Sequence, residues 1–220
     1  MKQLHLLLSR KPSPAQLVMV LSSYCLVLLI IRILVSHTLF YGFLAWNLVL
    51  AFVPLLLTMI LQRKERLRHN RYGLLLLSFV WLLFLPNAPY IITDFFHLEK
   101  GALYMPEWFD VLLLTSFAWT GVLVGLLAMT AMQQLWAQRF SASKGRIFIV
   151  FAALLSGFGI YLGRFLRFNS WDILQHPFDL TTAITTAAFH WRTFGFSLGY
   201  GALLLLLYCS FRIPFQSTVQ

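Results

Sequence analysis

The chain has 220 residues, of which 60% are hydrophobic and 11% are charged, and its formal net charge is +10. A charged fraction so far below the roughly 25% of soluble domains excludes an ordinary water-soluble fold and predicts an integral membrane protein. The basic excess lies in short clusters beside long apolar runs, where membrane topology and anionic lipid account for it, so we expect no binding to nucleic acid.

Six apolar runs divide the chain, and a helix of about 20 residues crosses a hydrocarbon core about 30 Å thick. The runs are Leu17–Val35, Leu39–Leu61, Tyr72–Leu85, Phe109–Leu135, Ile147–Phe165 and Thr193–Phe211, the third being the shortest. We predict an all-α fold: a polytopic transmembrane helix bundle of about six spans, with short interfacial helices on its outer side. The whole chain, residues 1–220, is expected to be a single integral membrane domain.

The first run follows Lys2, Arg10 and Lys11, which is the charge order of a signal peptide. The run is longer than a typical signal core, and no small-x-small cleavage pattern follows it, so we interpret it as a retained first span. Both cysteines, Cys25 and Cys209, lie inside apolar runs and are expected to be small buried hydrophobes.

The third run ends at Pro86-Asn87-Ala88-Pro89. Two prolines remove backbone donors and end or sharply kink a helix. Because the apolar character continues through residues 90–92, this segment is expected to re-enter the membrane or to lie along it.

Lys and Arg are unequally divided between the two predicted faces. One face carries Lys2, Arg10, Lys11, Arg63, Lys64, Arg66, Arg68, Arg71, Arg139, Lys144, Arg146 and Arg212. The other face carries Lys100, Arg164, Arg167 and Arg192, with Arg32 near the end of the first span able to extend toward it. The positive-inside rule then places both termini in the cytoplasm.

Three G-x-x-x-G pairs lie in the later apolar segments, a spacing that lets two helix backbones approach closely. They are Gly121 and Gly125, Gly159 and Gly163, and Gly195 and Gly199. We expect spans four to six to pack tightly within one chain, which is favoured over a homodimer interface; the oligomeric state is not assigned.

Six of the seven acids fall in two short stretches on the outer face. If these stretches are helical, Asp94 and His97 lie at i, i+3, and Asp172 and His176 lie at i, i+4, so that each carboxylate shares a helix face with an imidazole. Asp94, His97 and Asp172 are therefore the candidate catalytic residues. Glu107 and Asp110 begin the fourth span, where acids complement the helix dipole, and receive no catalytic role.

A divalent metal such as Zn²⁺, Mn²⁺ or Fe²⁺ is the cofactor that these side-chain types suggest. The candidate ligands are Asp94, His97, Asp172, His176 and His190. No H-E-x-x-H spacing accompanies them, so simple exposure or structural pairing is the alternative. The sequence also contains no nucleophile elbow, phosphate-binding glycine loop or haem-attachment motif.

Arg164 and Arg167 offer a different chemistry, because guanidinium groups bind phosphate through paired hydrogen bonds. A lipid head group or another small anionic molecule is the ligand they would take. The alternative is that they extend to the interface or pair with an acid such as Asp172. Asn87 and Asn169 each follow a span end, where they would cap freed backbone groups or bind the same ligand.

Two longer motifs carry a family resemblance: Leu-Pro-Asn-Ala-Pro-Tyr-Ile-Ile-Thr-Asp-Phe-Phe-His-Leu from residue 85, and Gly-Arg-Phe-Leu-Arg-Phe-Asn-Ser-Trp-Asp-Ile from residue 163. The chain resembles the bacterial membrane-protein family catalogued as domain of unknown function 1361. The resemblance implies a multi-pass protein of the bacterial cytoplasmic (inner) membrane and implies no activity. It marks Asn87, Pro89, Tyr90, Asp94, His97, Arg164, Arg167, Asn169, Trp171 and Asp172, which adds Tyr90 and Trp171 to the candidate ligand-binding residues.

These observations favour an outward-facing polar pocket that binds or processes a lipid or small anionic ligand, and leave open whether the protein is an enzyme. A small transporter is less favoured, because spans two, four and six have almost no ionisable residue at their centres. A non-enzymatic accessory or scaffold subunit of a membrane complex is the third hypothesis.

Overall fold

The computed structural model describes residues 13–98, 105–175, 177–188 and 190–216. All regular secondary structure in these ranges is helical, and six helical segments are long and apolar enough to cross a membrane. The predicted all-α polytopic bundle with six spans is confirmed.

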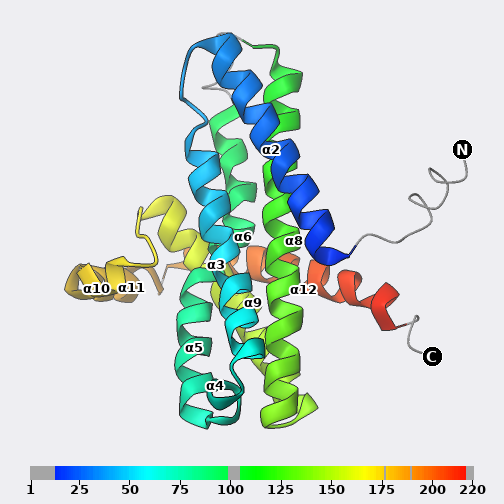
Figure 1. The fold of residues 1–220 in the computed structure, drawn as a ribbon. Helices are drawn as coiled ribbons and strands as arrows, with labels where there is room; N and C mark the ends of the chain where they lie inside the picture. Colours follow the sequence, from blue (N-terminus) through cyan, green and yellow to red (C-terminus); the bar gives the residue numbers. More distant parts are fainter. Residues whose placement is uncertain (1–12, 99–104, 176, 189, 217–220) are drawn as a thin grey trace, which may run out of the picture.

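The elements follow the chain in the order shown in Figure 1. They are α2 (Pro14–Ser36), α3 (Phe43–Arg63), α4 (Glu65–His69), α5 (Arg71–Phe84), α6 (Asn87–Tyr90), the 3₁₀-helix η1 (Ile91–His97), α8 (Glu107–Arg139), α9 (Ala142–Phe165), α10 (Asp172–Gln175), α11 (Pro177–Ala188) and α12 (Trp191–Gln216). The short helices α10 and α11 lie beside the main bundle.

Local capping sets several of the helix ends. The Ser13 hydroxyl accepts a hydrogen bond from the Gln16 backbone N–H at 3.3 Å, which starts α2, and the Ser141 hydroxyl accepts one from the Lys144 N–H at 3.2 Å, which starts α9. Helix α2 ends where His37 adopts a left-handed conformation with φ 52°.

The third span is interrupted near its middle, as the two prolines predict. Helix α5 ends at Phe84, and the chain continues as the single turn α6 and then as η1. Together these three elements form one candidate span, Arg71–His97. The segment after the prolines therefore extends the third span beyond its predicted end at Leu85.

Helix α8 is the centre of the bundle. Within the most apolar 18 residues of its candidate span, 67% are buried inside the protein, against 17% to 39% in the corresponding segments of the other five spans. It contacts α2, α3, α6, η1 and α9, and Figure 1 shows it running the full length of the molecule. A helix that is apolar on all sides can be enclosed in this way by other helices.

Two of the three G-x-x-x-G pairs pack against the broken part of span three. A Cβ atom on Gly121 would lie 2.8 Å from the Ala88 carbonyl oxygen, and one on Gly159 would lie 2.5 Å from Pro86 Cγ. Helices α8 and α9 thus hold the segment 86–91 from two sides, because their glycines leave room for its backbone and proline ring.

None of the three glycine pairs serves the packing among spans four to six that the spacing had suggested. The first two pairs face span three, and a Cβ on Gly195 or Gly199 would meet nothing within 4 Å. Helices α9 and α12 instead approach each other at Gly157 and Gly201, where a Cβ on Gly201 would lie 2.8 Å from Leu154 Cα. Spacing alone does not distinguish the glycines that face a neighbour from those that do not.

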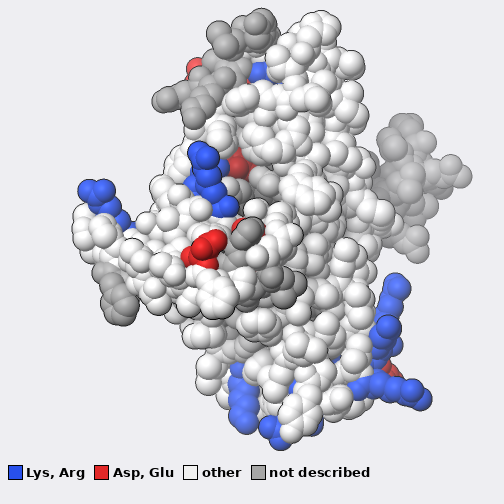
Figure 2. Space-filling model, turned by 90° about the vertical axis from the view of Figure 1, so that its left-hand side faces the viewer, with Lys and Arg blue, Asp and Glu red and all other residues white. Residues whose placement is uncertain are grey.

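The basic loops gather at one end of the bundle. The Arg139 Nε, at the end of α8, donates to the His69 carbonyl oxygen at 3.1 Å, which brings the loops around residues 63–71 and 139–146 together. Figure 2 shows a group of basic side chains, with a little acidic surface among them, at the lower end of the molecule, and acidic and further basic side chains around and above its middle. This separation matches the division of charge on which the predicted topology rests.

Candidate ligand-binding site

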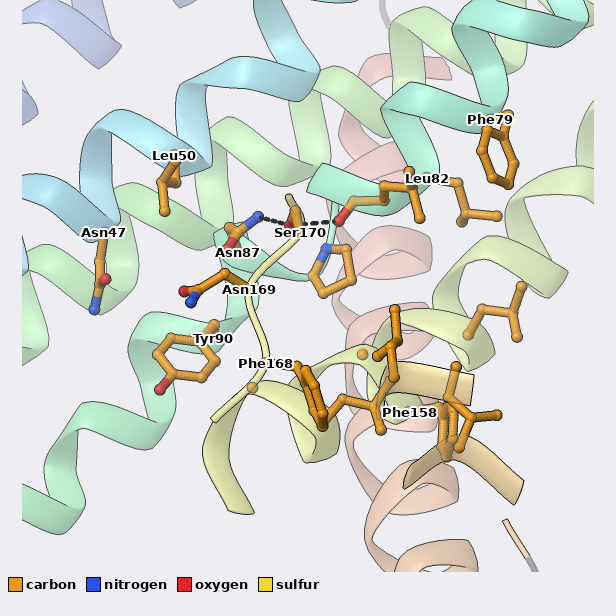
Figure 3. Close-up of a pocket in the computed structure, with 18 of the residues that line it drawn as sticks. Asn47, Leu50, Phe79, Leu82, Asn87, Tyr90, Phe158, Phe168, Asn169 and Ser170 are labelled. Atoms are coloured by element: carbon orange, nitrogen blue, oxygen red, sulfur yellow. Dashed lines mark hydrogen bonds between the residues drawn. The ribbon is translucent and has the colours of Figure 1, made fainter. Parts of the chain in front are cut away.

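A cavity of about 360 Å³ opens beside the break in span three. Helices α3, α5, α6, α9 and α11 and the loop after α9 contribute to its wall. Its larger part is apolar and includes Leu50, Phe79, Leu82, Leu155 and Phe158. Its polar lining groups are Asn47, Asn87, Tyr90, Asn169 and Ser170, several of which face one another in Figure 3.

We call the polar lining groups the rim of the cavity. The break in span three supplies the hydrogen bonds that hold Asn87 and Ser170 of this rim in place. A helix that ends at proline leaves carbonyl groups without intrahelical partners. Asn87 Nδ2 donates to the Phe84 carbonyl at 2.9 Å, and the Ser170 hydroxyl donates to the Leu83 carbonyl at 2.8 Å. Asn87 Nδ2 also lies 3.0 Å from Ser170 Oγ, which links the two outer stretches of the sequence (Figure 3).

Asp94 is buried behind this rim, with 1% of its surface exposed. One carboxylate oxygen accepts a hydrogen bond from Asn47 Nδ2 at 3.0 Å, and the other lies 3.4 Å from a guanidinium nitrogen of Arg164. Both partners are needed, because a buried carboxylate is costly unless it is paired and hydrogen-bonded.

Arg164 is also held by aromatic rings. Its guanidinium carbon lies 5.0 Å from the Phe96 ring centroid and 6.0 Å from that of Tyr90. The alternative that Arg164 pairs with an acid is confirmed, and the acid is Asp94 of η1 instead of Asp172, which was the example named.

Asp172 has a local role. Its carboxylate accepts a hydrogen bond from the Asn169 backbone N–H at 2.6 Å and so closes the turn before α10. The Asn169 side chain is left to face the cavity, and the Trp171 ring packs edge to face against Trp46 at 6.4 Å. Arg167 is exposed with φ 61°, and no ion pair to it occurs in the described ranges.

The described histidine side chains among the candidates lie in separate surroundings. The His97 ring lies 5.2 Å from Phe43 and 6.4 Å from Phe40, while Asp94 turns toward Asn47 and Arg164. His190 is exposed, and its Nδ1 accepts a hydrogen bond from the Arg192 backbone N–H. His176 lies outside the described residues, and no cluster of three or more His, Cys, Asp or Glu suited to a metal occurs among those that are described.

Sequence reasoning missed a second buried ion pair, between Arg32 of α2 and Asp110 of α8. Arg32 Nε lies 2.6 Å from one carboxylate oxygen, and a second guanidinium nitrogen lies 3.3 Å from the other. The Tyr41 ring lies 5.4 Å from the guanidinium, and burial, helped by the Asp110 charge, raises the pKa of Tyr41 to about 12.

This pair was not predicted from the sequence, because Arg32 was expected to reach toward the interface and Asp110 was explained by the helix dipole. The available signal was that both lie inside apolar runs near the same predicted face.

These features define a multi-pass α-helical membrane protein in which the two polar stretches that are predicted to face outward meet beside one cavity. The chain belongs to the family described as protein of unknown function (DUF1361), whose model matches residues 46–207. That range contains both motifs and every residue of the cavity wall. No curated protein and no solved structure matches the chain.

Proposed function

We propose that the protein binds an amphipathic ligand, a lipid or a related molecule with an apolar chain and an anionic head, in the cavity beside the broken third span. The single observation that carries this proposal is the division of the wall into an apolar part and an amide-rich rim. Ligand sites combine these two features, with apolar groups for affinity and a few polar groups for orientation.

The size of the cavity suits part of a lipid. Ligand pockets usually measure about 300 to 1,000 Å³, and this cavity lies at the lower end of that range with about 360 Å³. It accommodates one chain segment with its linkage to the head group, and the remainder of the molecule stays in the bilayer.

The arginines beside the rim favour an anionic head. Arg164 is linked to the rim through Asp94, which binds Asn47, and Arg167 directly precedes Phe168 and Asn169 of the cavity wall. Arg164 is already neutralised by Asp94, so Arg167 is the residue that supplies net positive charge to an incoming phosphate or carboxylate.

Binding is better supported than catalysis. The three acid–base candidates have different partners: Asp94 pairs with Arg164, His97 packs on aromatic rings, and Asp172 closes its own turn. Catalysis by a pair of groups requires both to reach one reacting atom. We assign Asp94 the role of positioning Asn47 and Arg164.

The positive-inside distribution places the cavity rim toward the outer face of a bacterial cytoplasmic membrane, with both termini in the cytoplasm. Reporter fusions at the two termini and at the 167–171 loop test this orientation. A cytoplasmic signal from the loop would contradict it.

Transport is the second candidate function, and one observation favours it. The third span is broken near its middle beside the cavity, and transporters place ligand sites at such discontinuous helices. Cysteines placed singly at Phe79, a half-exposed residue of the apolar part of the wall, and at Asn169, on the rim, separate the two functions. Access of a polar maleimide to Phe79→Cys from the cytoplasmic side and to Asn169→Cys from the outer side indicates transport.

The binding proposal is tested with a phosphatidylglycerol analogue that carries a diazirine on one acyl chain, incorporated into nanodiscs with the protein. Peptides from the cavity wall are expected to dominate the crosslinks. Leu50→Trp fills the cavity and is expected to lower this labelling about tenfold, which corresponds to roughly 1.4 kcal/mol. The matched control is Leu56→Trp on the same helix, because Leu56 is 53% exposed and does not line the cavity. Equal labelling of both variants would contradict the proposal.

A further inference from the structure

A second cavity, of about 260 Å³, lies at the opposite, basic end of the molecule between α9 and α12. Its wall includes Arg146 of α9, Arg212 of α12 and Gln133 of α8, together with the apolar side chains Ile149, Val150 and Leu205. We propose that this cavity binds a phosphate group through the two arginines. The inference is independent of the outer cavity and of the function proposed for it.

Polar groups of neighbouring buried residues hold the Arg212 side chain in place. Gln133 is 8% exposed, and its side-chain oxygen accepts hydrogen bonds from a guanidinium nitrogen of Arg212, at 2.7 Å, and from the Tyr208 hydroxyl. The guanidinium carbon also lies 5.9 Å from the Tyr208 ring centroid. Helices α8 and α12 thus hold this cation at the cavity wall, and one bond to Gln133 leaves further guanidinium N–H groups for a ligand.

The charges in this cavity are not balanced by acids. None of the eight described residues of its wall is Asp or Glu, and neither arginine forms an ion pair in the described parts of the chain. Within the described residues, a guanidinium nitrogen of Arg146 donates to the Ser143 hydroxyl at 3.4 Å. Two cations beside an apolar wall favour an anion, and the half-buried Arg212 is less screened by water than the exposed Arg146.

Phosphate is the anion that best fits two guanidinium groups from different helices. Each guanidinium presents paired N–H donors that match phosphate oxygens, and two of them reach a single phosphate from two sides. The source is either a phospholipid head group, with its chain along Ile149, Val150 and Leu205, or a soluble phosphate from the cytoplasm. Phospholipid is favoured by the apolar wall and by the position at a membrane-facing groove between two spans.

Cys209 provides a built-in reporter for this cavity. It is exposed and lies in the cavity wall, whereas Cys25, the other cysteine of the sequence, is buried. The experiment measures the rate at which N-ethylmaleimide modifies Cys209 in three preparations: phosphatidylcholine nanodiscs, nanodiscs containing phosphatidylglycerol, and phosphatidylcholine nanodiscs with added inorganic phosphate. Mass spectrometry of the Cys209 peptide gives the rate.

Phosphatidylglycerol is expected to slow the modification about threefold or more in the wild type, since an occupied cavity covers the thiol. Arg146→Gln and Arg212→Gln are expected to lose this protection. Arg139→Gln removes the same charge from the same end of the molecule without touching the cavity, so it controls for the surface potential and is expected to keep the protection. Arg146→Gln removes no buried hydrogen bond, so it tests the site even if Arg212→Gln folds poorly.

The three preparations separate the sources of phosphate. Protection by phosphatidylglycerol alone supports a lipid head group, and protection by inorganic phosphate supports a soluble phosphate ligand. Absence of protection in both, or equal protection in the wild type and Arg146→Gln, overturns the proposal.

Discussion

Two buried Arg–Asp pairs lie away from the end of the molecule where the basic loops gather, and they differ in their surroundings. Arg32 and Asp110 meet through two guanidinium nitrogens at 2.6 and 3.3 Å, with side chains 3% and 1% exposed. Arg164 and Asp94 meet through one contact of 3.4 Å, and the Arg164 side chain is 10% exposed. The first pair joins α2 to the central helix α8, and the second lies behind the rim of a cavity.

The comparison shows that two buried ion pairs of the same chemistry can have different surroundings. Arg32–Asp110 is a closed contact between two helices, beside the neutral Tyr41. Asp94 divides its two oxygens between Arg164 and an asparagine that lines the cavity. A cavity and a shared hydrogen-bond partner distinguish the second pair, and the proposed ligand site rests on these features.

The largest expected loss of stability comes from breaking the Arg32–Asp110 pair. Asp110→Asn leaves Arg32 buried without its counter-charge, and such a loss costs about 3–5 kcal/mol. The measurement is the thermal unfolding of the purified protein in detergent. The double variant Arg32→Met with Asp110→Leu is the control, since an apolar replacement of a buried ion pair is often neutral. If Asp110→Asn unfolds at the wild-type temperature, the pair is not structural.

A smaller loss of stability is expected when the close contact between α9 and span three is overpacked. Gly159→Ala places a methyl group 2.5 Å from Pro86 Cγ, and overpacking of this kind costs about 1–3 kcal/mol. Gly199→Ala meets nothing within 4 Å and is expected to be neutral or to stabilise by less than about 1 kcal/mol through helix propensity. The same unfolding assay compares them, and equal behaviour of the two variants would refute the assigned packing.

Asp94→Asn is expected to cost less than Asp110→Asn, about 1–2 kcal/mol, since its amide oxygen still accepts from Asn47 and the partly exposed Arg164 is able to reach water. Its larger consequence is for the ligand, because Arg164 is no longer neutralised by Asp94 and adds net positive charge beside the rim. Photocrosslinking by the phosphatidylglycerol analogue is expected to rise relative to that by a matching phosphatidylcholine analogue. A loss of stability as large as that of Asp110→Asn would remove the distinction between the two pairs.

Local patterns predicted the fold well and the site only in part. The six spans follow from hydrophobic length, and the break at Pro86 follows from the missing backbone donor. The motif residues Asn87 and Asn169 do line one cavity, although no residue spacing connects them. The helical pairing of Asp94 with His97 did not anticipate their surroundings, because Asp94 turned toward Asn47 and Arg164 and His97 toward Phe43.

The sequence by itself determined that this is a six-span membrane protein with its basic and acidic loops on opposite faces, because hydrophobic length and charge distribution are local properties that the bilayer reads directly. The tertiary structure alone decided which arginine meets which aspartate, which glycines face the broken segment and where the cavities lie. Those contacts join residues that are far apart in the chain, and they depend on how the helices tilt and approach, which no local pattern encodes.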